Sequence, residues 1–111
     1  MKPLIRTIIC DDAGSPFMGI GVLWLLERVD KFKSLRMAAA DMKMSYAKAH
    51  RIVKELELAC GKPVLLRSRG GAKRGGSELT DEGRAFMAKY SRFEKAVQSS
   101  ARKIYRTEFA K

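Results

Sequence analysis

The chain has 111 residues, 46% of them hydrophobic, which suffices for one domain with a modest core and excludes a wholly disordered basic protein. Lysine and arginine number 23 against 12 acidic residues, giving a net charge of +11 and an isoelectric point near 10.1. This excess indicates a polyanionic partner: DNA, RNA or an anionic membrane surface. Residues 43–76 hold nine basic and two acidic residues, so +7 of the charge lies in this third of the chain.

Several other classes of protein are disfavoured. Cys10 and Cys60 have neither zinc-site spacing nor a C-x-x-C motif, so we expect two buried or half-buried free thiols. The longest apolar run, residues 17–26, is too short to span a bilayer, and the N-terminus does not resemble a signal peptide. We therefore expect a cytoplasmic protein with no membrane association, metal or cofactor. A single histidine, His50, and the lack of a nucleophile–base pair make an enzyme the least expected class.

The first predicted elements are a strand and a helix. Residues 3–10 are rich in β-branched side chains and are followed by the turn cluster DDAGSP, where Pro16 marks a possible helix start. A helix is predicted from about residue 18 to 31. One apolar face carries Val22, Leu25, Leu26 and Val29, and another carries Ile20, Leu23 and Trp24. Because the helix is apolar over so much of its circumference, we expect it to contact both its own core and a partner subunit.

A helix-turn-helix is predicted over residues 34–60. Ser34 is a typical N-cap for a short helix over residues 35–42, in which Leu35, Ala38, Ala39 and Met42 have helical spacing. Ser45 can cap a third helix over residues 46–60, which Gly61 and Pro63 end. Two short helices joined by a tight turn have the form of a helix-turn-helix.

The third helix is predicted to present a basic face. Helical spacing places Ala49, Ile52, Val53 and Leu56 toward the core. Short and basic side chains then point outward, as expected of a helix that enters a major groove, where arginine can donate two hydrogen bonds to guanine. The candidate DNA contacts are Ser45, Tyr46, Ala47, Lys48, His50, Arg51 and Lys54, with Ser34 and Arg36 of the preceding helix on the DNA backbone. The alternative is a solvated basic face.

The glycine-rich stretch after this helix is predicted to be the tip of a β-hairpin, or wing, over residues 64–79. It lies between strand-like residues 64–66 and 77–79 and lacks both common phosphate-binding glycine motifs. Glycines at such a tip allow close approach to a phosphate, while basic side chains neutralise it or enter the minor groove. The candidate contacts are Arg67, Arg69, Gly70, Gly71, Lys73, Arg74, Gly75 and Gly76. A solvated hairpin without a ligand is the alternative.

A long helix is predicted over residues 80–106, opened by Thr80 with acidic residues in its first turn. Its apolar positions follow alternating spacings of four and three, which favours helix–helix dimerisation. The predicted dimer interface comprises Leu23, Trp24, Phe86, Tyr90, Phe93, Val97 and Ile104. The predicted fold is therefore mainly α with a small β-hairpin: a single winged helix-turn-helix domain over residues 1–111 with a long C-terminal dimerisation helix.

The segments SLRMAAADMKMSYAKAHRIVKELE and GKPVLLRSRGGAKRGGSELTDEGRAFMAKY carry family motifs: A-A, M-S-Y-x-x-A, P-x-L-x-R, two glycine pairs and L-T-x-x-G. With these motifs the chain resembles the N-terminal winged-helix domain of the ModE family of molybdate-responsive regulators and, more distantly, LysR-type DNA-binding domains. His50 stands where the family usually has tryptophan, and Lys43 where a turn glycine is common. The family's molybdate-binding domain would follow the last helix, so with the chain ending at Lys111 we expect no molybdate sensing here.

The resemblance implies a homodimer with its third helix in the major groove and its wing on the flanking backbone or minor groove. We therefore expect a sequence-specific transcription regulator that binds double-stranded DNA at a palindromic operator. Two alternatives remain open: a sequence-tolerant architectural DNA-binding protein, and a winged-helix module that binds other proteins. The sequence does not identify a small-molecule effector.

Overall fold

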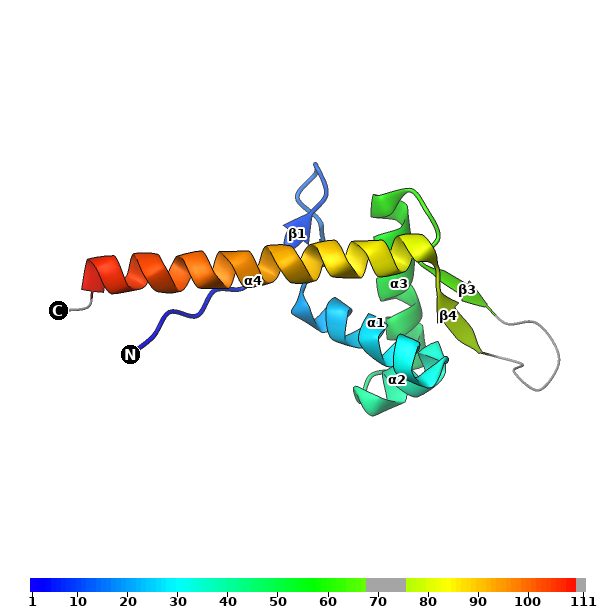
Figure 1. Cartoon of the computed structure of the whole chain (residues 1–111). Helices are drawn as coiled ribbons and strands as arrows, with labels where there is room; N and C mark the ends of the chain where they lie inside the picture. The colour runs from blue at the N-terminus through cyan, green and yellow to red at the C-terminus, as the bar shows by residue number, and fades with distance from the viewer. Residues whose placement is uncertain (68–75, 110–111) are drawn as a thin grey trace.

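The computed structural model describes residues 1–67 and 76–109. The three shorter helices, α1 (Ile20–Phe32), α2 (Leu35–Asp41) and α3 (Tyr46–Cys60), gather with the hairpin of β3 (Leu65–Arg67) and β4 (Ser77–Leu79) at one end of the long helix α4 (Asp81–Phe109). The remaining length of α4 projects away from them (Figure 1). The molecule extends over 62 × 29 × 23 Å for this reason. The elements are β1 (Ile9–Cys10), β2 (Pro16–Met18), α1 (Ile20–Phe32), α2 (Leu35–Asp41), α3 (Tyr46–Cys60), β3 (Leu65–Arg67), β4 (Ser77–Leu79) and α4 (Asp81–Phe109). The predicted fold class is confirmed.

Helix α1 is the centre of the core because it is buried on two sides. Leu25 and Val29 pack against the small residues Ala38, Ala39 and Ala49, which lets α2 and α3 approach α1 closely. Leu23 and Leu26 belong to a second cluster, together with Met18, Leu56, Val64, Leu79 and Tyr90. The helix thereby connects the helix-turn-helix to the hairpin and α4.

Local signals set the ends of the helix-turn-helix as predicted. The Ser34 hydroxyl accepts the Met37 N–H, and the Ser45 hydroxyl accepts the Lys48 N–H, each at 3.0 Å. Between the two helices Lys43 has a φ of 58°, a left-handed conformation that favours glycine. This conformation explains why a turn glycine is common at this position in the ModE family, which the sequence resembles.

Residues at both ends of the hairpin connect it to the helices. The Glu57 carboxylate accepts the N–H groups of Val64 (2.8 Å) and Leu65 (3.3 Å), which attaches β3 to α3. At the other strand, the Ser77 N–H donates to the Lys33 carbonyl at the end of α1, at 2.9 Å. The strands are antiparallel, with Leu65 opposite Leu79. The hairpin therefore has a set position relative to α1 and α3.

The L-T-x-x-G motif is explained by the junction between β4 and α4. The Thr80 hydroxyl donates to the Pro63 carbonyl (2.7 Å) and accepts the Gly83 N–H (2.9 Å), so Thr80 caps α4 and holds the start of the hairpin. A Cβ on Gly83 would lie 2.6 Å from the Val64 carbonyl oxygen. Only glycine permits this close approach.

The N-terminal prediction is wrong in two respects. Only Ile9–Cys10 of the predicted strand over residues 3–10 forms a strand, because its single partner is the three-residue β2. Pro16 begins that strand and not a helix; α1 starts at Ile20. The backbone before β1 instead meets side chains of α4: the Tyr90 hydroxyl donates to the Thr7 carbonyl (2.7 Å), and the Gln98 amide to the Ile5 carbonyl (2.6 Å).

The two cysteines differ. Cys60 is half-buried, as predicted, and burial raises the pKa of its thiol. Cys10 is exposed, contrary to the prediction, because it lies at the end of the short β1–β2 pair and outside both core clusters.

Candidate nucleic-acid interface

The rotation of α3 is as predicted. Ala49 and Leu56 are fully buried and Val53 is 5% exposed, while Ile52 is half-buried against the cluster that contains Ala49 and Val53. The opposite side of the helix is therefore directed to solvent. Exposed or half-exposed there are Tyr46, Ala47, Lys48, His50, Arg51 and Lys54.

Most of the positive charge on this face is not paired with an acidic side chain of the described residues. Among the described residues, Lys48 and Arg51 make no salt bridge, whereas Lys54 lies 3.8 Å from the Glu57 carboxylate. Glu57 is itself engaged with the backbone of β3. Lys48 and Arg51 are thus the basic residues of α3 with the most charge available to an external anion.

Both predicted phosphate-contacting serines act as helix caps. Each hydroxyl uses its oxygen to accept a backbone N–H, at Ser34 for α2 and at Ser45 for α3. A hydroxyl that accepts one hydrogen bond still has its own proton to donate. Capping and a phosphate contact are therefore compatible.

Tyr46 connects α3 to both neighbouring elements, which sequence reasoning missed. Arg36 of α2 lies over its ring, with the guanidinium carbon 4.2 Å from the ring centroid. Arg67 of β3 donates from Nη1 to the Tyr46 hydroxyl at 2.7 Å. His50, one turn along α3, packs against it with 6.0 Å between ring centroids. No sequence pattern could have indicated this, because Tyr46 and Arg67 are 21 positions apart.

The predicted wing residues are only partly described. Arg67 is exposed at the end of β3, and Gly76 is half-buried immediately before β4. The strands that flank the wing are confirmed, with the first shifted by one residue to 65–67. Six predicted contacts lie outside the described residues: Arg69, Gly70, Gly71, Lys73, Arg74 and Gly75.

The structure corrects the predicted dimer interface. Tyr90 is 2% exposed and Leu23 7% exposed, so both side chains belong to the core of the single chain, although Tyr90 also lines the groove beside Trp24. Burial also raises the pKa of the Tyr90 hydroxyl, with a smaller contribution from the Glu94 charge. Phe86 is half-buried and packs on Phe17, with 6.4 Å between ring centroids. Phe86 and Tyr90 lie on the side of α4 that the rest of the chain covers.

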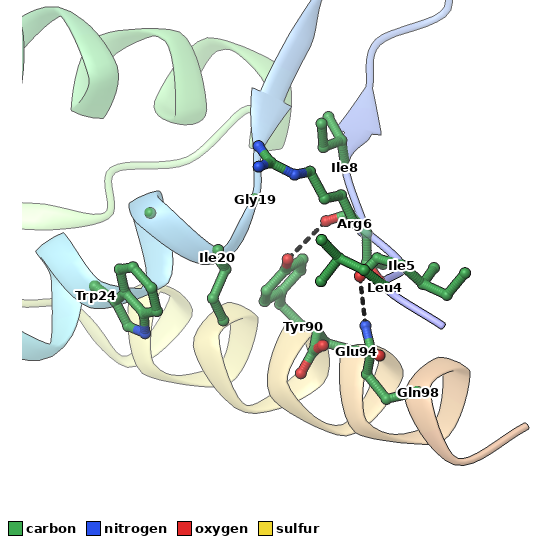
Figure 2. A pocket seen from close by; sticks show the side chains of 12 residues that line it. Leu4, Ile5, Arg6, Ile8, Gly19, Ile20, Trp24, Tyr90, Glu94 and Gln98 are labelled. Carbon is green, nitrogen blue, oxygen red and sulfur yellow. Dashed lines mark hydrogen bonds between the residues drawn. The ribbon is translucent and has the colours of Figure 1, made fainter. Parts of the chain in front are cut away.

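The other predicted interface residues remain accessible to different extents. Trp24, Phe93 and Ile104 are exposed, and Val97 is half-buried. Beside Trp24 lies a groove of about 600 Å³ between residues 4–8, the start of α1 and α4 (Figure 2). Its apolar residues outside the prediction are Leu4, Ile5, Ile8 and Ile20, of which Leu4 is 81% exposed. The apolar residues near the N-terminus could have indicated this groove, but they were interpreted as part of the predicted strand over residues 3–10.

Comparison with known proteins identifies the family. Residues 22–84, from the first turn of α1 to the first turn of α4, match the model for bacterial regulatory helix-turn-helix proteins of the lysR family. The chain belongs to the lysR family. The matched region of this lysR-family chain includes the capped helices, the hairpin strands and the Thr80–Gly83 junction.

Two curated relatives have names that refer to molybdenum. The molybdenum transport protein ModE of Azotobacter vinelandii is 33% identical over 76 residues, covering 68% of this chain and 28% of the relative. The molybdenum-pterin-binding protein MopA of Rhodobacter capsulatus is 28% identical over 96 residues, covering 86% of this chain and 36% of the relative. This lysR-family chain thus spans about a third of the length of these curated relatives, and its similarity to ModE is supported.

Solved structures of CbnR, a LysR family transcriptional regulator, are also similar to this lysR-family chain. Its DNA-binding domain in complex with DNA has a TM-score of 0.59 at 26% identity, covering 75% of this chain and 90% of that one. Full-length CbnR with its target DNA has a TM-score of 0.60 at 28% identity, covering 79% and 29% of the respective chains.

Two further searches concern the described residues alone. Over residues 1–67 and 76–109, none of the helices has the length and apolar character needed to cross a bilayer. Over the same ranges, no three or more His, Cys, Asp or Glu side chains are grouped as metal ligands.

Proposed function

We propose that this chain is a sequence-specific DNA-binding transcription regulator that acts as a homodimer on double-stranded DNA. The observation that carries the proposal is the exposed basic face of α3, held outward by buried Ala49, Val53 and Leu56. Membership of the lysR family supports it, as does the likeness to CbnR, whose structures include complexes with DNA. In this proposal residues 1–111 act as one winged helix-turn-helix domain.

In the proposed complex α3 enters the major groove. Arg51 is the candidate for two hydrogen bonds to a guanine edge, and Lys48 and His50 are candidates for base or phosphate contacts. Ala47 is small enough to permit close approach of the helix to the bases. Lys54, partly neutralised by Glu57, is assigned to a phosphate.

The glycine-rich stretch is assigned to the flanking backbone or minor groove. Its assignment rests on its composition and on its position between β3 and β4, which lie beside the N-terminal end of α3 through the contact of Arg67 with Tyr46. Arginine and lysine in such a wing neutralise phosphates and add salt-dependent affinity.

The dimer is assigned to the exposed apolar surface formed by Trp24, Phe93 and Ile104 together with the groove beside Trp24, which we call the dimer surface. The C-terminal part of α4 projects beyond the packed helices (Figure 1), so the apolar side chains of that part are not covered by the chain's own core. An exposed apolar surface of this kind is typical of a protein–protein interface. A two-fold dimer presents two α3 helices to successive turns of DNA.

Selection of binding sites from a randomised duplex pool tests the proposed function. We expect enriched sequences with two-fold symmetry and half-sites about 10 base pairs apart, or a multiple of that distance. The full chain is the protein to use, and a footprint on an enriched duplex checks the spacing. Enrichment of single unpaired half-sites contradicts the dimer, and binding without any enrichment favours an architectural DNA-binding protein.

The variant Arg51→Ala should weaken binding to the selected duplex by about 1 to 3 kcal/mol and relax base preference at one position in each half-site. The reason is that the lost side chain reads a base edge. Lys54→Ala is the matched control on the same helix. Its loss of binding affinity should be smaller, and equal for the selected and the random duplex. Competition titrations with both duplexes measure the difference. Equal losses on both duplexes for Arg51→Ala would remove this residue from base readout.

A further inference from the structure

Three side chains from three different elements meet at the N-terminal end of α3. Arg36 comes from α2, Tyr46 is the first residue of α3, and Arg67 is the last residue of β3. The Arg36 guanidinium carbon lies 4.2 Å from the centroid of the Tyr46 ring, and Arg67 Nη1 donates to the Tyr46 hydroxyl at 2.7 Å. One tyrosine therefore holds two guanidinium groups, one over its ring face and one at its oxygen.

Neither guanidinium is neutralised by the part of the chain that the structure describes. No carboxylate within residues 1–67 and 76–109 forms a salt bridge with Arg36 or Arg67. Tyr46 attracts one group through its electron-rich face and accepts a hydrogen bond from the other, but it carries no compensating charge. Two positive groups held close together without an acidic partner favour an anion between or beside them.

Each guanidinium retains donors for that anion. Arginine has five N–H donors, and the contact with Tyr46 uses one of those on Arg67. A guanidinium over an aromatic ring keeps its N–H groups at the rim of the ring, where they can bind a phosphate in the bidentate manner. Both arginines are exposed, and Ser45, next to Tyr46, retains a hydroxyl proton to donate.

We propose that Arg36 and Arg67 bind one DNA backbone phosphate between the start of α3 and the base of the wing, with Tyr46 as the positioning residue. This inference rests on the proposed function and identifies one phosphate subsite within it. Tyr46 contacts both arginines and thereby keeps their guanidinium groups on the same side chain. His50 limits the freedom of the Tyr46 ring by packing against it from the next turn.

Methylphosphonate interference tests the subsite, because it removes the charge of one phosphate at a time without changing the bases. The probes are a duplex recovered by site selection and a set in which each phosphate in turn is a methylphosphonate. The proteins are the full-length wild-type chain, Arg36→Ala with Arg67→Ala, Tyr46→Phe and, as the control that removes one positive charge elsewhere, Arg51→Ala. Tyr46→Phe keeps the ring under Arg36 but removes the acceptor for Arg67.

With the wild-type protein, we expect one position per half-site at which the methylphosphonate lowers affinity about tenfold or more, the size of a charged hydrogen bond. With the double arginine variant the penalty at that position should fall to less than about twofold, while penalties elsewhere persist. Tyr46→Phe should reduce the same penalty by an intermediate factor without changing the others. Arg51→Ala should leave the penalty unchanged. A general loss of folding would weaken all positions alike and cannot produce this pattern.

The outcomes separate the two proposals. If the chain binds no duplex, the proposed function fails and the subsite fails with it. If the chain binds DNA but the double arginine variant has the wild-type pattern of methylphosphonate penalties, the subsite alone is overturned. If the double arginine variant loses the penalty but Tyr46→Phe retains it in full, the positioning role of Tyr46 is overturned.

Discussion

Replacing Trp24 with glutamate is expected to convert the proposed dimer to a monomer and to lower its affinity for a symmetric duplex by about a hundredfold or more. Trp24 is 47% exposed and forms one wall of the groove between residues 4–8, α1 and α4 (Figure 2). A carboxylate in an apolar contact loses hydration without gaining a partner, so the interface is destabilised. The chain itself should remain folded, because the side chain lies outside both buried core clusters.

Sedimentation and DNA titration together measure this effect. Leu58→Glu is the control: Leu58 is 83% exposed on α3, does not line the groove, and acquires the same charge. The control should sediment like the wild-type chain. It shows how much of the loss of affinity comes from repulsion between the new carboxylate and DNA and not from loss of the dimer. A Trp24→Glu protein that sediments as a dimer would show that the interface lies elsewhere.

Replacing Gly83 with alanine is expected to lower the free energy of unfolding by about 1 to 3 kcal/mol, as other overpacked sites do. The new Cβ would lie 2.6 Å from the Val64 carbonyl oxygen and 3.1 Å from Val64 Cγ1. The Val64 carbonyl also accepts the Thr80 N–H at 2.9 Å. If Val64 moves away from α4, this hydrogen bond to Thr80, the residue that caps α4, is weakened as well. Because Val64 directly precedes β3, the displacement should also reduce DNA affinity.

Urea denaturation measures the loss of stability, at several protein concentrations so that a change in oligomerisation is detected. Gly21→Ala is the matched control: no atom lies within 4 Å of its added Cβ, and alanine in a helix is favoured over glycine by up to about 1 kcal/mol. Opposite signs for the two substitutions are the expected result. Equal or better stability of Gly83→Ala would mean that α4 and β3 separate without cost.

Short-range signals in the sequence determined the helices and their ends. Ser34 and Ser45 cap the helices that follow them, and the spacing of Ala49, Val53 and Leu56 set the buried side of α3. These predictions were correct because capping and helical periodicity depend on residues within a few positions of one another. The exposed basic face of α3 followed directly from the same periodicity.

Which apolar residues the chain itself covers was decided by the tertiary structure. Tyr90 and Trp24 were both assigned to the predicted dimer interface, yet Tyr90 is 2% exposed and Trp24 is 47% exposed. The difference arises because Tyr90 meets the N-terminal segment, 83 positions away, through its hydrogen bond to Thr7. Periodicity identifies an apolar side of a helix but not the segment that packs on it.

The sequence by itself thus determined the four helices in their order, the caps, the basic face of α3 and, to within one residue, the positions of the hairpin strands, but it missed β2. The tertiary structure decided the path of residues 3–8, the close approach of Gly83 to Val64 and the meeting of Arg36, Tyr46 and Arg67. The physical reason is distance along the chain: caps and helical faces form between neighbours, whereas these contacts join segments that only the packed core brings together.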